Sequence, residues 1–174
     1  MPIPGTSTRH HLAVTGSRFT VQPWYRQFYL RRGDAPWASD QVSNETYEVG
    51  VEAIGGFVVV GTEMYGSPTE VVVEADDEEP PVPEHVDRSV EVSIAGNGPL
   101  AVLSWGDDDP VGIVELPAGP IRMRVNWRGL TDTLTHPDYD LGGDDPSPET
   151  VLLQLWPGAD HPRLVQRGWS RRAQ

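Results

Sequence analysis

Short apolar segments separated by closely spaced turns constrain the fold of this chain more than any other feature. The turns come from 18 glycines and 17 prolines among 174 residues. No window of 11–18 residues has a convincing helical period, whereas several segments alternate apolar and polar residues as half-buried strands do. Strands joined by turns without helical crossovers imply antiparallel pairing. We therefore predict an all-β fold, a single antiparallel β-sandwich of about eight strands.

The expected strands are segments in which apolar and polar residues alternate or β-branched residues are frequent. Residues 47–52 alternate tyrosine and valine with glutamate and glycine, and residues 57–60 form an apolar run between glycines that fits a buried strand. Pro23 marks a bend or an edge position in the first segment. Turns at 96–98 and 117–120 each predict a hairpin. The full set of expected strands is 19–30, 47–52, 53–62, 69–75, 89–95, 100–105, 113–116, 121–127 and 151–156.

The organisation expected from these segments is one domain at 18–160, after a flexible lead-in at 1–17 and before an arginine-bearing tail at 161–174. A chain of this length can bury a sizeable core. The residues expected to form it are the inward-facing apolar positions, namely Phe57, Val59, Val90, Val92, Ile94, Val102, Ile113, Ile121, Met123, Val125, Leu153 and Leu155.

Charge is distributed very unevenly along the chain. Residues 34–160 hold all 26 acids and only four arginines, a net charge of −22, while both ends carry arginine and no acid. A body this acidic repels nucleic acid and anionic membranes and attracts basic surfaces. The residues at 1–17 contain no apolar secretory segment, and no stretch approaches a membrane span. We therefore expect a soluble, cytoplasmic protein whose partner is basic.

Recognisable chemistry is scarce in the sequence. Without cysteine there is no disulfide, thiolate metal site or cysteine nucleophile, and without lysine there is no lysine base. None of the five histidines has a metal-binding spacing, and no nucleophile or phosphate-loop motif occurs. We expect no enzyme activity, no cofactor and no metal. An enzyme with an unrecognised carboxylate and histidine site remains an alternative.

One acidic loop invites a calcium hypothesis. Counted from Asp138, residues 138–149 carry acids at positions 1, 3 and 12 and glycine at position 6, as an EF-hand loop does. Asp145 occupies a position that is apolar in EF-hand loops. Prolines stiffen the second half of the 138–149 segment, and neither flank is helical. A solvated surface loop is favoured, with a calcium-dependent ligand-binding or adhesion module kept as an alternative.

Three segments resemble a known family. Residues 25–30 (YRQFYL) resemble a Tyr-His-Gln-Phe-x-Val segment of the competence protein ComJ (Nin) family. Residues 47–60 resemble that family's small-residue strand and the apolar strand after it. Residues 116–123 with Trp127 resemble its Leu-Pro-x-Gly-x-Tyr-x-Leu stretch and later tryptophan. The resemblance implies a small, non-enzymatic β protein that inhibits a DNA-entry nuclease, and it assigns no contact residue.

The charge and the resemblance favour the same function, because a nuclease lines its site with basic residues. We expect an acidic protein that inhibits, or confers immunity to, a nuclease or another basic protein. Arg122 and Arg124 share one strand face and are expected to pair with acids. The first docking candidate is Asp76–Glu79, because Pro80, Pro81 and Pro83 stiffen the chain beside it. The aromatic segment 24–29 is the second choice. The expected partner-binding residues are Asp76, Asp77, Glu78, Glu79, Asp107, Asp108 and Asp109.

Overall fold

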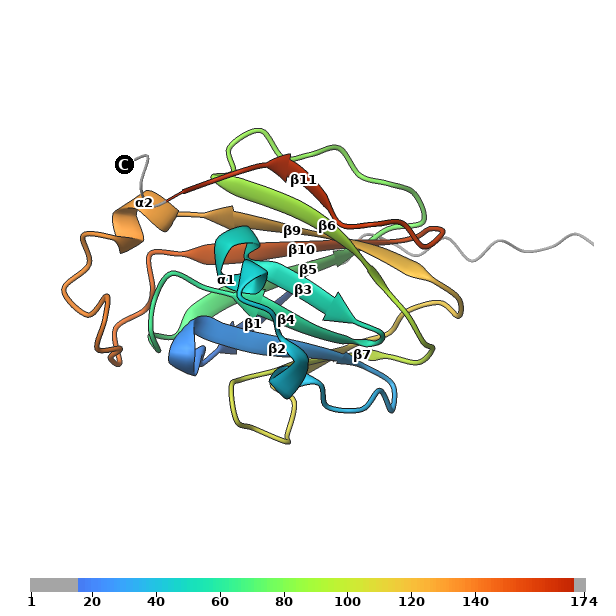
Figure 1. Cartoon of the computed structure of the whole chain (residues 1–174), viewed down its shortest axis with the longest axis horizontal. Coiled ribbons are helices and arrows are strands. Elements are labelled where there is room, and N and C mark those ends of the chain that lie inside the picture. Colours follow the sequence, from blue (N-terminus) through green and yellow to red (C-terminus); the bar gives the residue numbers. More distant parts are fainter. Residues whose placement is uncertain (1–15, 171–174) are drawn as a thin grey trace, which may run out of the picture.

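Two β-sheets dominate the computed structural model, which describes residues 16–170 (Figure 1). The six-stranded sheet has the order β1-β5-β10-β9-β6-β11 and the five-stranded sheet the order β3-β4-β2-β7-β8. The first sheet contains β1 (Ser17–Val21), β5 (Thr69–Ala75), β6 (Arg88–Ile94), β9 (Ile121–Arg128), β10 (Thr150–Pro157) and β11 (Leu164–Arg167). The second contains β2 (Gln27–Arg32), β3 (Val51–Ile54), β4 (Phe57–Gly61), β7 (Leu100–Leu103) and β8 (Gly112–Val114).

Helical structure within the described residues is short. It comprises α1 (Glu45–Val49), α2 (Leu130–Thr133) and the 3₁₀ turns η1 (Trp24–Arg26) and η2 (Ser39–Gln41). No helix within residues 16–170 has the length and hydropathy needed to cross a membrane. The predicted predominance of β structure is confirmed.

The main core lies where residues of both sheets meet. The five-stranded sheet contributes Val58 and Val60, and the six-stranded sheet contributes Val90, Met123 and Leu153. Because successive strand residues point to opposite faces, Phe57 and Val59 enter a smaller cluster instead, with Tyr29, Ala38 and Leu103. All but one of the predicted core residues are buried.

Ile113 is the exception, and its prediction as a core residue is wrong. Its side chain is 58% exposed, whereas its neighbour Val114 packs against the main core. Strand β8 lies at the edge of its sheet, where alternation places every second side chain in solvent.

The strand predictions are correct in the middle of most segments and wrong in three respects. The described residues contain eleven strands in place of about eight, in part because the 19–30 segment breaks at Pro23 into β1 and β2, and because β11 forms within the predicted tail. Residues 47–49 belong to α1, which ends at Gly50 with a left-handed φ of 94°. Strands β5 and β10 pair in parallel, so the pairing is not wholly antiparallel. The predicted lead-in lies almost entirely outside the described residues.

Both predicted hairpins are wrong. Strands β6 and β7 belong to different sheets, as do β8 and β9, so each turn carries the chain from one sheet to the other. Arg32, which is 1% exposed, joins the two crossings. Its guanidinium donates to the Gly119 and Pro117 carbonyls, both at 2.8 Å, and more distantly to the carbonyls of Ile94 and Gly98. Burial lowers the pKa of this guanidinium.

Replacing Arg32 by methionine is expected to lower the free energy of unfolding by about 2 kcal/mol, because buried carbonyls lose charge-assisted donors. Urea unfolding monitored by circular dichroism measures the change. Arg18→Met is the control, since the ion pair that Arg18 makes with Glu70 is exposed. Equal stability losses in the two variants would contradict the role given to Arg32.

Candidate partner-binding surfaces

The loop at Asp107–Asp109 presents its three carboxylates to solvent. It follows Trp105 at the end of β7, and all three residues are exposed. Gly106, at a φ of 78°, turns the chain outward. Within residues 16–170 none of the three carboxylates takes part in an ion pair. Their charge is therefore available to a partner.

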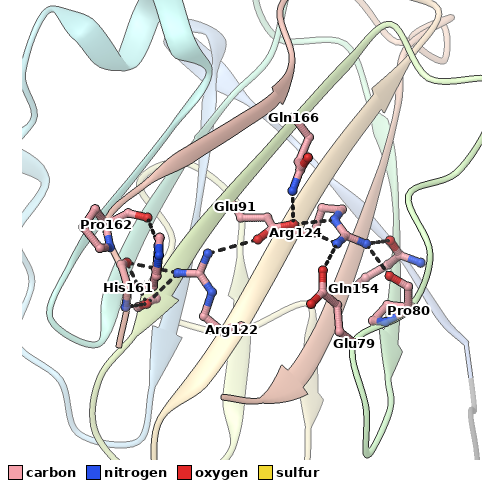
Figure 2. A network of polar contacts seen from close by, with 10 residues as sticks. Glu79, Pro80, Glu91, Arg122, Arg124, Gln154, His161, Pro162 and Gln166 are labelled. Carbon is pink, nitrogen blue, oxygen red and sulfur yellow. Dashed lines mark hydrogen bonds and ion pairs between the residues drawn. The ribbon is translucent and has the colours of Figure 1, made fainter. Parts of the chain in front are cut away.

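The loop at Asp76–Glu79 is held against the protein. The Asp76 amide donates to the Leu155 carbonyl at 2.8 Å. A carboxylate oxygen of Glu79 accepts from the buried Arg124 guanidinium at 2.7 Å, and Arg124 also donates to the Pro80 carbonyl at 2.6 Å (Figure 2). Glu79 therefore has an intramolecular role besides any docking role.

Arg124 belongs to a buried ionic network on the outer face of the six-stranded sheet (Figure 2). Glu91 accepts from Arg124 at 2.7 and 2.9 Å, from Arg122 at 3.1 Å and from Gln166 of β11 at 2.8 Å. The Arg124 guanidinium also lies 5.0 Å from the centre of the Trp156 ring. The expected pairing of Arg122 and Arg124 with acids is confirmed.

The network fixes the charge of Glu91. Burial raises the pKa of the Glu91 carboxyl, but hydrogen bonds from Arg124, Gln166 and Arg122 outweigh it, so the pKa is lowered overall. Glu91 thus holds together two arginines of β9, the C-terminal strand and, through Arg124, the acidic loop.

The two acidic loops lie at opposite ends of β5. Next to the Asp107–Asp109 loop, the backbone amide of Trp105 donates to the Gln22 carbonyl. Gln22 follows Val21, which pairs with Thr69 at the start of β5. Asp76 directly follows the other end of that strand. Seven residues of strand span about 20 Å. Asp76–Glu79 and Asp107–Asp109 therefore belong to two separate surfaces.

A cluster of aromatic rings lies beside the Asp107–Asp109 loop. We call it the aromatic end surface and define it by Trp24, Tyr25, Tyr65 and Trp105. The Tyr25 ring lies 4.7 Å from the Trp105 ring and 5.5 Å from the Tyr65 ring, which lies 5.9 Å from the Trp24 ring. Trp24 and Tyr25 are both exposed. The sequence placed aromatics at 24–29 but could not show that Tyr65 and Trp105 join them.

Unusual backbone holds Tyr25 in place. Tyr25 and Arg26 have φ values of 56° and 63°, the two left-handed non-glycine residues within the described part of the chain. Such residues cost of order 1 kcal/mol each and persist where surrounding contacts enforce them. Here Arg26 binds Asp140 at 2.5 Å and lies 4.4 Å from the centre of the Tyr139 ring. This strained turn directs the Tyr25 ring outward.

A pocket of about 680 Å³ has Arg26 in its lining. The residues that line it are Arg26, Tyr47, Glu48, Glu63, Arg88, Trp169 and Ser170. The buried Arg88 guanidinium lies 3.6 Å from Glu63 and between the rings of Trp127 and Trp169. An enzyme site of the kind considered above needs a histidine with two carboxylates, and these lining residues include two carboxylates without a histidine.

Glu149 is fully buried next to Glu63, one of the residues that line this pocket. One of its oxygens accepts the Glu63 and Met64 amides at 2.8 and 3.3 Å, and the other has no hydrogen-bond partner among residues 16–170. Burial, together with the nearby Glu63 charge, raises the pKa of Glu149 to about 8 despite those amides and Arg88. Sequence reasoning missed the cluster of Glu63, Arg88 and Glu149, because these residues are far apart in the chain.

The acids of residues 138–149 point to different places. Asp140 binds Arg26, while Glu149 turns into the interior. Within residues 16–170 no group of three or more histidine, aspartate or glutamate side chains is placed to hold a metal ion. The geometry gives the calcium module no support, because its position-12 ligand is engaged elsewhere.

Comparison with known proteins gives a fold likeness. No protein-family model matches the sequence, and no curated protein is significantly similar to it. Among solved structures, ComJ from Bacillus subtilis, described as an inhibitor of the DNA-degrading activity of NucA, superposes with a TM-score of 0.62 at 11% identity. The match covers 84% of this chain and 99% of ComJ. The protein of crocagin biosynthetic gene J superposes with a TM-score of 0.58 at 14% identity, covering 85% and 100%.

These findings define the class of fold. The chain is a two-sheet β protein with charged loops and an exposed aromatic cluster at one end. More particularly, it has a ComJ-like fold. The expectation of that fold, which rested on three short segments, is supported.

Proposed function

We propose that this chain is a non-enzymatic binding protein that inhibits a nuclease or another basic protein. The observation that supports this most is the exposed triple carboxylate at Asp107–Asp109, free of ion pairs within the described residues, on a fold like that of a nuclease inhibitor. A nuclease site lined with arginine and lysine attracts such carboxylates, which mimic the charge of phosphates.

Within this proposal the Asp107–Asp109 loop is the first docking candidate and the Asp76–Glu79 loop the second. The order is the reverse of the one predicted from the sequence. Glu79 already neutralises Arg124, so a partner at that loop would compete with an existing ion pair. No such competition arises at Asp107–Asp109.

Inhibition is tested directly with purified proteins. The chain is titrated into NucA and into nucleases encoded near its own gene, and plasmid degradation is followed. Stoichiometric loss of activity of at least one nuclease is expected. Full activity of all of them at tenfold excess of the chain would remove the nuclease from the proposal.

Reversing the charge of Asp107, Asp108 and Asp109 to arginine is expected to slow association with an inhibited nuclease roughly tenfold. Stability should change by no more than about 0.5 kcal/mol, because exposed charges contribute little. Stopped-flow association at several salt concentrations measures both steering and its screening, since the Debye length is about 8 Å at physiological salt.

The matched control reverses Asp34, Asp40 and Glu115, three exposed acids outside this loop. It changes the net charge equally, so an equal loss of rate would show that overall charge, and not the loop, attracts the partner.

A further inference from the structure

We propose that the aromatic end surface receives an arginine-bearing segment of a partner protein, with Asp107–Asp109 as its counter-charges. This inference rests on the proposed function for the basic character of the partner, and it adds the docking surface and the side chain recognised.

Charge and ring chemistry are complementary to arginine at this place. Tyrosine and tryptophan faces attract cations, and a guanidinium stacks on them better than an ammonium does. Tyr25 is 54% exposed, so much of its ring is open to a ligand. Asp107 follows Trp105 by two residues, which places its Cα within about 7 Å of that of Trp105. A single arginine can therefore contact ring and carboxylate together.

The surface is also preorganised. The Trp24 ring rests on glycine backbone, since a Cβ added at Gly66 would lie 2.5 Å from it and one at Gly142 would lie 3.2 Å from it. The left-handed turn at Tyr25 and Arg26 is anchored by Asp140. Rings fixed before binding lose little entropy when a partner arrives, and aromatic anchors of this kind often dominate binding energy.

Other exposed aromatics lack this combination. Trp37 already has the guanidinium of Arg31 at 5.5 Å from its ring centre, so an arginine of the chain itself occupies it. Tyr47 is 60% exposed but stands on α1, away from the Asp107–Asp109 loop. The comparison favours the aromatic end surface as the arginine site.

The test uses two fluorescently labelled peptides of equal charge, hexa-arginine and hexa-lysine, titrated into the full chain by anisotropy. Hexa-arginine is expected to bind at least fivefold tighter than hexa-lysine. The variant Tyr25→Asn removes the ring but keeps a residue that tolerates left-handed backbone. It should lose the arginine preference while hexa-lysine binding stays within twofold. Tyr47→Asn, the same change at a similarly exposed tyrosine, should keep the preference.

Equal binding of the two peptides by the unaltered chain, or an unchanged preference in Tyr25→Asn, would overturn the inference. Thermal melts of both variants show that folding is retained. The assay contains no nuclease, so its result is separate from the proposed function. If a nuclease is inhibited equally by Tyr25→Asn and the unaltered chain, this docking surface is wrong while inhibition stands. If no nuclease is inhibited but the arginine preference depends on Tyr25, the surface stands with another basic partner.

Discussion

Glu91→Ala is expected to lower the free energy of unfolding by about 3–5 kcal/mol, a large share of the stability of a domain this size. The substitution leaves the buried Arg122 and Arg124 guanidiniums without their shared carboxylate and removes the hydrogen bond to Gln166. Urea unfolding followed by tryptophan fluorescence measures the loss. Hydrogen exchange at Leu164–Arg167 should also accelerate, because that strand loses a link to the sheet.

Glu70→Ala is the matched control for this experiment. Glu70 also pairs with an arginine, but both side chains are exposed, so a change of less than about 1 kcal/mol is expected. If Glu91→Ala cost no more than Glu70→Ala, the buried network would not be a major source of stability.

Stability should fall by roughly 3 kcal/mol as the pH rises from 5 to 8, on account of Glu149 alone. The pKa of its carboxyl is about 8 in the fold against 4.5 ordinarily. The folded state therefore holds the proton more tightly, and this contribution is present below pH 4.5 and lost as the pH rises through 8. Protonation of Glu149 leaves the ion pair between Arg88 and Glu63 in place.

Glu149→Gln is expected to flatten this part of the pH dependence, since glutamine keeps an acceptor for the Glu63 and Met64 amides without a titrating proton. Chemical unfolding of both proteins at pH 5, 6, 7 and 8 provides the comparison. Asp145→Asn, at an exposed neighbour, serves as control and should follow the unaltered chain. Parallel curves for Glu149→Gln and the unaltered chain would rule out this carboxyl as the source.

Sequence patterns predicted best the four central strands of the six-stranded sheet. Strand β5 matches its predicted range, and β6, β9 and β10 match within a residue. Alternation also placed Arg122 and Arg124 on one face. The hairpin predictions at residues 96–98 and 117–120 failed, because glycine and proline form the turn of a hairpin and the crossing between two sheets equally well.

The candidate sites were harder to predict because they join distant segments. Tyr25, Tyr65 and Trp105 meet only through the packing of the sheets. Glu63 and Glu149, which meet in the interior, are likewise far apart in the chain. One local sign was available: Arg88 shares the strand parity of Val90 and Val92, which indicates an inward-facing charge in need of a partner.

The position of β10 has a consequence for the order in which the protein can assemble during synthesis. Strand β10 lies in the middle of the six-stranded sheet, between β5 and β9, although it is synthesised after β1, β5, β6 and β9 (Figure 1). The β1–β5 pair and the β6–β9 pair can form earlier, but no strand joins them within that sheet until residues 150–157 have left the ribosome. Each half meanwhile exposes an unpaired strand edge, a species prone to aggregation. Ribosome-bound chains ending before residue 150 should therefore remain protease-sensitive, and protease resistance should rise once β10 has emerged.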